Sequence, residues 1–324
     1  MFRIKVQEIL FGLGLLCFCA AASICRADES NKITFRRQPG RVVFNAADKT
    51  IATYVYGDPQ ILRPYFTDLR APSGVQVTRH HPPRKGIDAD DHATMHPGLW
   101  LAFGDISTND FWRNKARVRH AGFNKEPYAG ERYAGFTVRN KYMSDGEIVC
   151  QESCMITILS RPAGYLILWD SEFRSDRESF YFGDQEEMGL GVRLATPIVV
   201  KSNKGGRILD DQGNLNEKKI WGKPSLWCDY AGPIDNVFAG VMIMPDPDNF
   251  APCRWHVRDY GFMTANPFGK KAFNLGAPGK VIVNKGKPFC LSFGILLHSS
   301  KDEKAINLDA AYKDYLKIRS EFKR

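Results

Sequence analysis

Two histidines lie in the stretches of the chain that are densest in polar and aromatic residues. His96 belongs to residues 91–105, and His256 belongs to residues 255–262. Because imidazole titrates near neutral pH, each could give a proton to a ring oxygen or take one from a hydroxyl. We therefore predict that His96 and His256 are the catalytic acid and base. The carboxylate that orients them would be Asp105 or Glu187, with Glu186 as a further choice.

The same stretches hold side chains that could bind a substrate. Arg193 and Arg258 could hold a carboxylate or sugar hydroxyls, or stabilise a developing oxyanion. The alternative for both arginines is an internal salt bridge. Trp100 and Trp112 could stack on sugar rings, although most tryptophans in a sandwich belong to its core. Asn266, of a residue type that favours turns, completes the predicted substrate-binding set.

A metal site is a further hypothesis. His92 and His96 are four residues apart, a spacing that would present both to one metal ion if they lay on a helix. Pro97 favours a loop instead. From a loop, two imidazoles with Asp91 or Asp105 could still bind a divalent ion such as Zn²⁺. The alternative is that both are hydrogen-bonded loop histidines. Apart from this possible divalent metal, the sequence does not indicate a cofactor.

The elements that would position these residues are mostly short strands. Runs rich in Val, Ile, Tyr, Phe and Thr recur between turn-forming residues, and several alternate by twos. They lie at residues 41–45, 50–56, 75–79, 154–160, 165–173, 189–200, 240–244, 280–284 and 289–298. One amphipathic helix is expected at 308–322, capped by Asn307. The pattern predicts an all-β fold, a large antiparallel β-sandwich in one domain (residues 28–324) with a C-terminal helix.

The N-terminus has the pattern of a removable secretory signal peptide at residues 1–27. Two basic residues precede an apolar run at 9–22, and small residues after this run match the cleavage preference of signal peptidase. Cleavage is expected after Ala27, with cleavage after Ala22 or a lipoprotein at Cys25 as alternatives. The run falls short of the ~20 apolar residues that a membrane span needs. We therefore predict a periplasmic or extracellular protein that does not span a membrane.

Charge and cysteines bear on its partners. The formal net charge is +9, but the Lys and Arg clusters are short, as in solvated loops, so nucleic acid is not expected as a partner. An acidic polysaccharide or an anionic envelope surface is the alternative. Five cysteines follow the leader, and their disulfide pairing is open: Cys150, Cys154, Cys228, Cys253 and Cys290. A turn could let Cys150 and Cys154 bond, or several could be small buried side chains.

Longer motifs resemble a known family. They lie at residues 91–105, 110–112, 182–193, 221–222, 227, 229–232, 245–249 and 255–269. In them the chain resembles the secreted bacterial proteins called PmoA-like, a family of uncharacterised function. The usual central pattern of that family reads DHPHHRGLW. Here Gly98-Leu99-Trp100 puts His96 on the second of the paired histidines and Met95 on the first, which counts against any mechanism that requires both.

The resemblance implies an architecture and a class of activity. The family is similar to the galactose-mutarotase-like supersandwich, whose sugar site lies on a concave sheet. We therefore predict a secreted carbohydrate-active protein that acts on a sugar or modified sugar by proton transfer, as a mutarotase, epimerase or lyase. The alternatives are a non-catalytic glycan-binding or envelope module and a metal-dependent oxidoreductase or hydrolase. Phosphate-binding loops, nucleophile elbows and nucleotide fingerprints are missing from the sequence.

Overall fold

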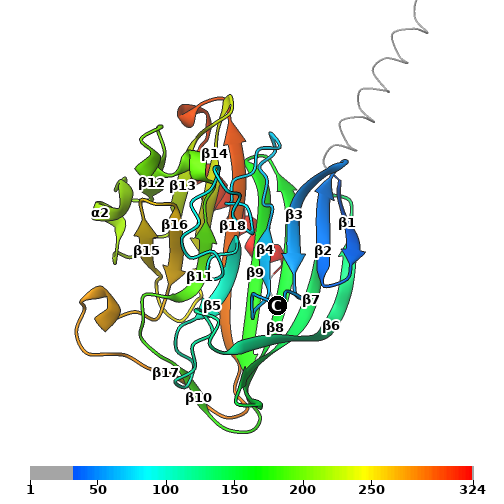
Figure 1. The fold of residues 1–324 in the computed structure, drawn as a ribbon, viewed down its shortest axis with the longest axis vertical. Coiled ribbons are helices and arrows are strands. Elements are labelled where there is room, and N and C mark those ends of the chain that lie inside the picture. The colour runs from blue at the N-terminus through cyan, green and yellow to red at the C-terminus, as the bar shows by residue number, and fades with distance from the viewer. Residues whose placement is uncertain (1–31, 323–324) are drawn as a thin grey trace, which may run out of the picture.

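Two large antiparallel sheets make up the body of the protein (Figure 1). The computed structural model describes residues 32–322, so the predicted signal peptide at residues 1–27 lies outside the described part. The first sheet has eight strands, in the order β1 (Ile33–Gln38), β2 (Arg41–Ala46), β3 (Lys49–Val55), β4 (Tyr65–Thr67), β5 (Leu99–Phe103), β11 (Met188–Arg193), β16 (Phe262–Asn266) and β15 (Arg254–Arg258).

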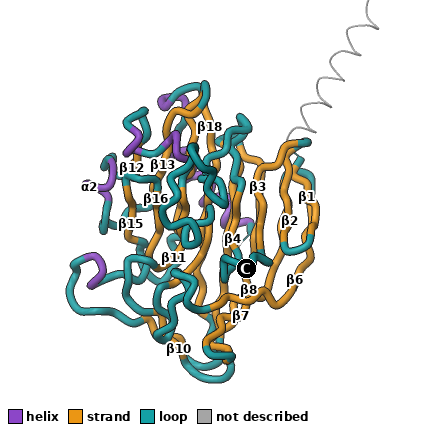
Figure 2. The backbone as a smooth tube through the Cα atoms, in the orientation of Figure 1, coloured by secondary structure: helices purple, strands orange, loops and turns teal. Residues whose placement is uncertain are grey.

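The second sheet also has eight strands and faces the first. Its order is β12 (Arg207–Asp210), β13 (Cys228–Ile234), β14 (Val237–Pro245), β18 (Phe289–Ser300), β9 (Gly164–Arg174), β8 (Glu147–Arg161), β7 (Tyr133–Ser144) and β6 (Arg117–Ala129). A separate pair joins β10 (Phe180–Phe182) to β17 (Val281–Val283). The α-helices are α2 (Asn216–Ile220) and α3 (Leu308–Glu321), with 3₁₀ turns η1 (Thr196–Ile198), η2 (Val200–Ser202), η3 (Lys271–Phe273) and η4 (Glu303–Ala305). Loops rather than helices connect most strands (Figure 2).

The main core lies between the two sheets. Alternate residues of each strand point into it, as the period of two in the sequence predicts. Phe66 of β4 meets Trp169 of β9 edge to face with ring centroids 5.8 Å apart. Phe103 of β5 meets Phe173 of β9 in the same way at 5.4 Å. The prediction of a large antiparallel β-sandwich is therefore confirmed.

Helix α3 covers the outer face of the second sheet. Its buried residues are Leu308, Ala311, Tyr312, Tyr315 and Ile318, and they pack on side chains of β9, β14 and β18. The Asn307 side chain accepts a hydrogen bond from the Ala310 N–H at 2.9 Å, as expected of an N-cap. The predicted C-terminal helix and its cap are confirmed.

The outer face of the first sheet is covered by loops. Trp100, Gly191, Thr264 and His256 stand in register across β5, β11, β16 and β15, so their side-chain positions share this face. Gly191 has no side chain, and a Cβ there would lie 2.9 Å from ring atoms of both Trp100 and Trp112. The glycine therefore lets two indole rings rest directly on the sheet.

Two expected strands differ from the structure. Residues 75–79 form no regular strand and make only isolated bridges, Arg70 to Gln76 and Thr78 to Leu194. The run at 189–200 is a strand only as far as Arg193, because Pro197 starts a 3₁₀ turn. A proline has no N–H to donate to a ladder, so a strand rarely continues through it.

None of the five cysteines within residues 32–322 forms a disulfide. Cys150 and Cys154 both lie in β8, where four residues span about 13 Å, much more than a disulfide allows. The hypothesis of a turn-closed bridge is wrong. Along residues 32–322, no helix has both the length and the apolar character needed to cross a membrane.

Candidate functional site

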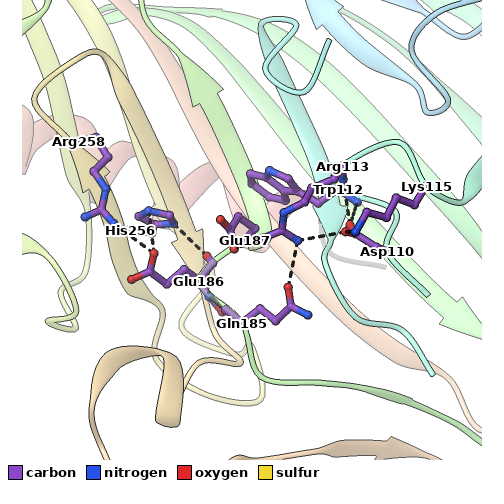
Figure 3. A network of polar contacts seen from close by, with 10 residues as sticks. Asp110, Trp112, Arg113, Lys115, Gln185, Glu186, Glu187, His256 and Arg258 are labelled. Carbon is purple, nitrogen blue, oxygen red and sulfur yellow. Dashed lines mark hydrogen bonds and ion pairs between the residues drawn. The ribbon is translucent and has the colours of Figure 1, made fainter. Parts of the chain in front are cut away.

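The candidate site lies on the loop-covered face, beside β15 and the segment that leads into β11 (Figure 3). His256 of β15 is buried, with 6% of its side chain exposed, whereas 27% of the Glu186 side chain is exposed. His256 Nε2 lies 3.4 Å from Glu186 Oε2, and Arg258 Nη2 donates to the same oxygen at 3.2 Å. Arg258 also pairs with Glu217 at 3.3 Å. One carboxylate oxygen therefore contacts both an imidazole and a guanidinium.

Burial sets the protonation of this pair. It lowers the pKa of His256 to about 3, and the Arg258 charge acts in the same direction. It raises the pKa of Glu186, against the opposing effect of Arg258. His256 Nδ1 lies 3.2 Å from the Glu186 carbonyl oxygen, which can only accept, so we assign the ring proton to Nδ1. A neutral nitrogen base thus stands beside a carboxyl group that keeps its proton to a higher pH than usual.

Glu187 turns to the other side of the segment. Figure 3 shows Glu186 directed toward His256 and Glu187 directed toward Arg113. Arg113 Nη2 lies 2.6 Å from Glu187 Oε2, and Arg113 Nη1 contacts Asp110 at 3.2 Å and Gln185 at 3.1 Å. The side chains of Arg113 and Glu187 are 31% and 29% exposed. Two consecutive glutamates therefore form ion pairs with two different arginines, Glu186 with Arg258 and Glu187 with Arg113.

Asn266 fixes the backbone of this segment. Its Nδ2 donates to the carbonyls of Gln185 at 2.8 Å and Glu186 at 3.1 Å. Its Oδ1 accepts from the N–H groups of Phe268 at 2.8 Å and Gly269 at 3.1 Å. The side chain is fully buried. The predicted substrate contact is therefore corrected, because Asn266 makes four hydrogen bonds within the protein that hold the Gln185–Glu186 backbone against the turn after β16.

Asp184 anchors the loop that follows β16. Its carboxylate accepts from four backbone N–H groups, those of Lys270, Lys271, Ala272 and Gly279, at 2.9, 3.0, 3.2 and 2.8 Å. Burial opposes the charge, but these N–H groups outweigh it and lower the pKa of Asp184. The segment 184–187 is thereby tied to the loop on one side and to Arg113 on the other.

His96 is enclosed by rings. Its imidazole is nearly parallel to Phe262 and Trp100, at centroid distances of 4.6 and 5.0 Å and plane angles of 12° and 16°. Burial, assisted by the nearby His92, lowers the pKa of His96 well below its ordinary value. His256 meets the same Phe262 edge-on at 4.9 Å. Both predicted catalytic histidines thus pack on the ring of Phe262, and of the two only His256 contacts Glu186 among the described contacts.

The hypothesis of a metal held by His92 and His96 does not fit the geometry. The two imidazoles are stacked, with centroids 4.9 Å apart and planes 19° from parallel. Ring nitrogens bind a metal in the plane of the ring at about 2.0–2.1 Å, so one ion cannot lie in both planes. His92 Nδ1 instead contacts Asp91 Oδ2 at 2.9 Å. Within residues 32–322, no group of three or more His, Cys, Asp or Glu side chains is placed to hold a metal ion.

Two other predictions are corrected by internal contacts. Arg193, with 2% of its side chain exposed, donates from both terminal nitrogens to Asp91 at 2.9 and 2.7 Å. The internal salt bridge was the alternative, and together with the burial of the Arg193 side chain it keeps this guanidinium away from a ligand. The Asp105 carboxylate accepts from the Thr108 N–H at 2.8 Å and lies against Gly183. Asp105 therefore shapes a turn and orients neither histidine.

Trp100 and Trp112 are core side chains. They are 0% and 1% exposed, and their rings meet at 5.3 Å and 71°. A buried indole cannot stack on a sugar ring that arrives from solvent, so the predicted platform is wrong. The prediction failed because loops cover this face of the sheet and bury both rings, and the strand pattern of the sequence does not reveal these loops.

Gln185, Arg113 and Glu217 are among the residues of the network that were not predicted as site residues. Gln185 lies within the polar stretch at 182–193 and Arg113 directly follows Trp112, so local composition could have suggested both. Glu217 lies in the short helix α2, where no motif stands out. It contacts Arg258 only because α2 packs beside β15.

Comparisons with known proteins give a family but no activity. The model of the "Family of unknown function (DUF6807)" matches residues 41–312. No curated protein matches the chain. The PmoA-like label is not tested by these findings.

Solved structures similar to the chain include three sugar-related proteins. A putative kojibiose phosphorylase from human microbiome is 10% identical at a TM-score of 0.38, over 90% of this chain and 37% of that one. The galactosidase domain of an alpha-galactosidase-sucrose kinase is 9% identical at 0.43, over 83% and 42%. A galactose mutarotase-like protein from Lactobacillus casei is 8% identical at 0.33, over 82% and 100%. The chain thus spans well under half of the first two, and these likenesses are too remote to identify an activity.

Proposed function

Since the chain belongs to the family of unknown function DUF6807, we propose its function from its own residues: acid and base catalysis on a carbohydrate. The observation that carries the proposal is the contact of Glu186 Oε2 with both His256 Nε2, at 3.4 Å, and Arg258 Nη2, at 3.2 Å. A buried neutral imidazole beside a partly exposed carboxyl of raised pKa is a pairing suited to proton transfer.

Space for a sugar lies beside the segment that carries Glu186. A pocket of about 840 Å³ is lined by Arg113, Gln185, Asn109 and Asp110 among others, and Arg113 and Gln185 connect it to the glutamate segment. Ligand pockets commonly measure 300–1,000 Å³. Planar guanidinium, amide and carboxylate groups suit the hydroxyls of a sugar, each of which both donates and accepts.

The simplest reaction for these groups is the opening and closing of a sugar ring. His256 Nε2 takes the proton from the anomeric hydroxyl, the bond between the anomeric carbon and the ring oxygen breaks, and the Glu186 carboxyl gives its proton to that oxygen. The reverse transfers close the ring on the other face. Arg258 stabilises Glu186 when it becomes a carboxylate. Epimerisation and elimination need the same two proton carriers.

The test compares two substitutions that keep size and remove proton transfer: Glu186→Gln and His256→Asn. The protein is offered reducing monosaccharides and uronate oligosaccharides, with anomer exchange followed by NMR and elimination followed by absorbance of the unsaturated product. Each substitution is expected to lower turnover about 10²- to 10⁴-fold. The exposed Glu178→Gln, which makes the same chemical change far from the site, should keep full turnover.

Two results would contradict the proposal. One is turnover that survives both substitutions. The other is saturable binding of a panel sugar with no change in that sugar, which would establish a glycan-binding module instead. Melting temperatures of the variants within a few degrees of the unaltered protein separate loss of catalysis from loss of folding.

The proposal also includes export, on the basis of the signal pattern at residues 1–27. Mass spectrometry of the protein from its native host would show a chain beginning after Ala27 or Ala22. A protein that keeps its first residues would contradict export without touching the catalytic proposal.

A further inference from the structure

A second pocket shares no lining residue with the first. The first, called here the Arg113 pocket, has the volume of about 840 Å³ given above and includes Lys115 and Arg117 in its wall. The second, called here the Arg254 pocket, measures about 560 Å³ and includes Lys270 and Lys280. The wall of the first includes the turn that joins β7 to β8, and the wall of the second includes the loops before β15 and after β16.

Contacts of neighbouring residues connect both pockets to the segment that carries Glu186 and to the strand that carries His256. Gln185, next to Glu186, lines the Arg113 pocket. Asp184 accepts from the N–H groups of Lys270 and Gly279, which line the Arg254 pocket. Arg254 lies two residues before His256 on β15, so both side chains start from the same face of the strand. Each pocket therefore includes a residue close in sequence to the proton-transfer pair, although neither wall contains Glu186 or His256 themselves.

The charges of the two pockets are mostly of one sign. Six cationic side chains line them, Arg113, Lys115 and Arg117 in one and Arg254, Lys270 and Lys280 in the other. The only carboxylates in their described walls are Asp110 and Asp145. Four of the cations, the three lysines and Arg117, are exposed. Exposed like charges on two sides of a site attract an anionic ligand and repel a cationic one.

The Arg254 pocket also offers apolar surface. Phe250 and Leu275 are 43% and 49% exposed there. Apolar side chains among cations suit a saccharide, which has C–H faces between its polar groups, better than they suit a small inorganic anion.

We propose that the substrate is an anionic oligosaccharide, such as a uronate chain, with charged units in both pockets and the reacting unit at Glu186 and His256. This inference rests on the proposed function and names its substrate class. Carboxylates of successive units pair with Lys115 and Arg117 on one side and with Lys270 and Lys280 on the other. Exposed pairs are individually weak and are screened by salt, so several must act together and affinity must fall as salt is added.

The test uses a galacturonate trimer and the same trimer with every carboxylate methyl-esterified, which removes charge and keeps the skeleton. Calorimetry at low and high salt should show that the ester binds at least about 10-fold more weakly, with a salt dependence for the acid alone. The double variants Lys115→Ala/Arg117→Ala and Lys270→Ala/Lys280→Ala should each lower affinity for the acid about 3- to 10-fold. The control Lys313→Ala/Lys317→Ala, on the exposed side of α3, should change nothing.

Four outcomes overturn the inference: no binding of the acid trimer at low salt, equal binding of acid and ester, no effect of either double variant, or equal binding of a single-stranded oligodeoxynucleotide. Turnover of a neutral sugar that depends on Glu186 and His256 would leave the proposed function standing while the charge preference fails. Binding of the acid trimer in preference to the ester, without any turnover, would leave the charge preference standing while the proposed catalytic function fails.

Discussion

Replacing Asn266 by alanine tests how the site is held. The side chain makes four hydrogen bonds, to the carbonyls of Gln185 and Glu186 and from the N–H groups of Phe268 and Gly269. At about 1 kcal/mol each, and with some groups reaching water after the change, the expected loss is about 3 kcal/mol of unfolding free energy. For the roughly 290 described residues, an unfolding entropy near 2.1 cal/mol/K per residue converts this into a drop in Tm of about 5 °C.

Urea denaturation measures the free energy, and turnover of the sugar measures the site. Since the lost bonds hold the Glu186 backbone, turnover should also fall about 10-fold or more in the folded variant. Asn249→Ala is the matched control. It removes an asparagine that bonds the Ser292 backbone at 2.9 and 2.8 Å on the second sheet, so it should cost stability and leave turnover unchanged. A loss below about 1 kcal/mol for Asn266→Ala, or unchanged turnover, would refute the reasoning.

Three further predictions concern stability. Asp184→Ala removes the acceptor of four backbone N–H groups, so amide exchange at Lys270, Lys271, Ala272 and Gly279 should speed up; unchanged protection would contradict the anchor. Asp229→Asn leaves the buried His298 and Arg207 without their carboxylate, and denaturation should show a loss of about 3–5 kcal/mol; a loss under about 1 kcal/mol would count against it. His256 has a folded pKa of about 3, below its unfolded value, so between about pH 3 and 6.5 the unfolded chain binds a proton that the folded chain does not, and folding stability falls as the pH is lowered through this range. The variant His256→Asn should remove up to about 1.4 kcal/mol per pH unit from the slope of unfolding free energy against pH, and equal slopes for the two proteins would disprove the assignment.

Local patterns predicted the framework well. Most of the predicted strands and the C-terminal helix follow from a periodicity of two or of 3.6 residues, whereas other strands, including the long β6 and β7, were not among the predicted runs. The exceptions have local causes that compete with the pattern. Pro197 stops β11 early, and residues 75–79 are extended without regular partners, because pairing depends on neighbours distant in sequence.

The candidate site was predicted only in part, since it depends on tertiary contacts. His256 and Arg258 do converge on a carboxylate, but sequence could not choose among Glu186, Glu187 and Asp105. A bend at residues 186–187, just before β11, directs the two glutamates to different partners, and Glu186 is the one that meets His256. The metal and indole predictions failed for a related reason, because the loops that bury those rings leave no periodic signal.

The two outer faces of the sandwich differ in how they could change over evolution. One face is closed by α3, whose buried residues pack closely on β9, β14 and β18, so substitutions there alter folding stability. The other is closed by loops in which core residues such as Ile106, Phe111 and Phe268 stand among exposed ones. Insertions or exchanges near residues 104–116 and 267–280 could reshape the Arg113 and Arg254 pockets while the sheets stay intact. The lengths of these two loops are therefore the feature by which to sort relatives that share this framework.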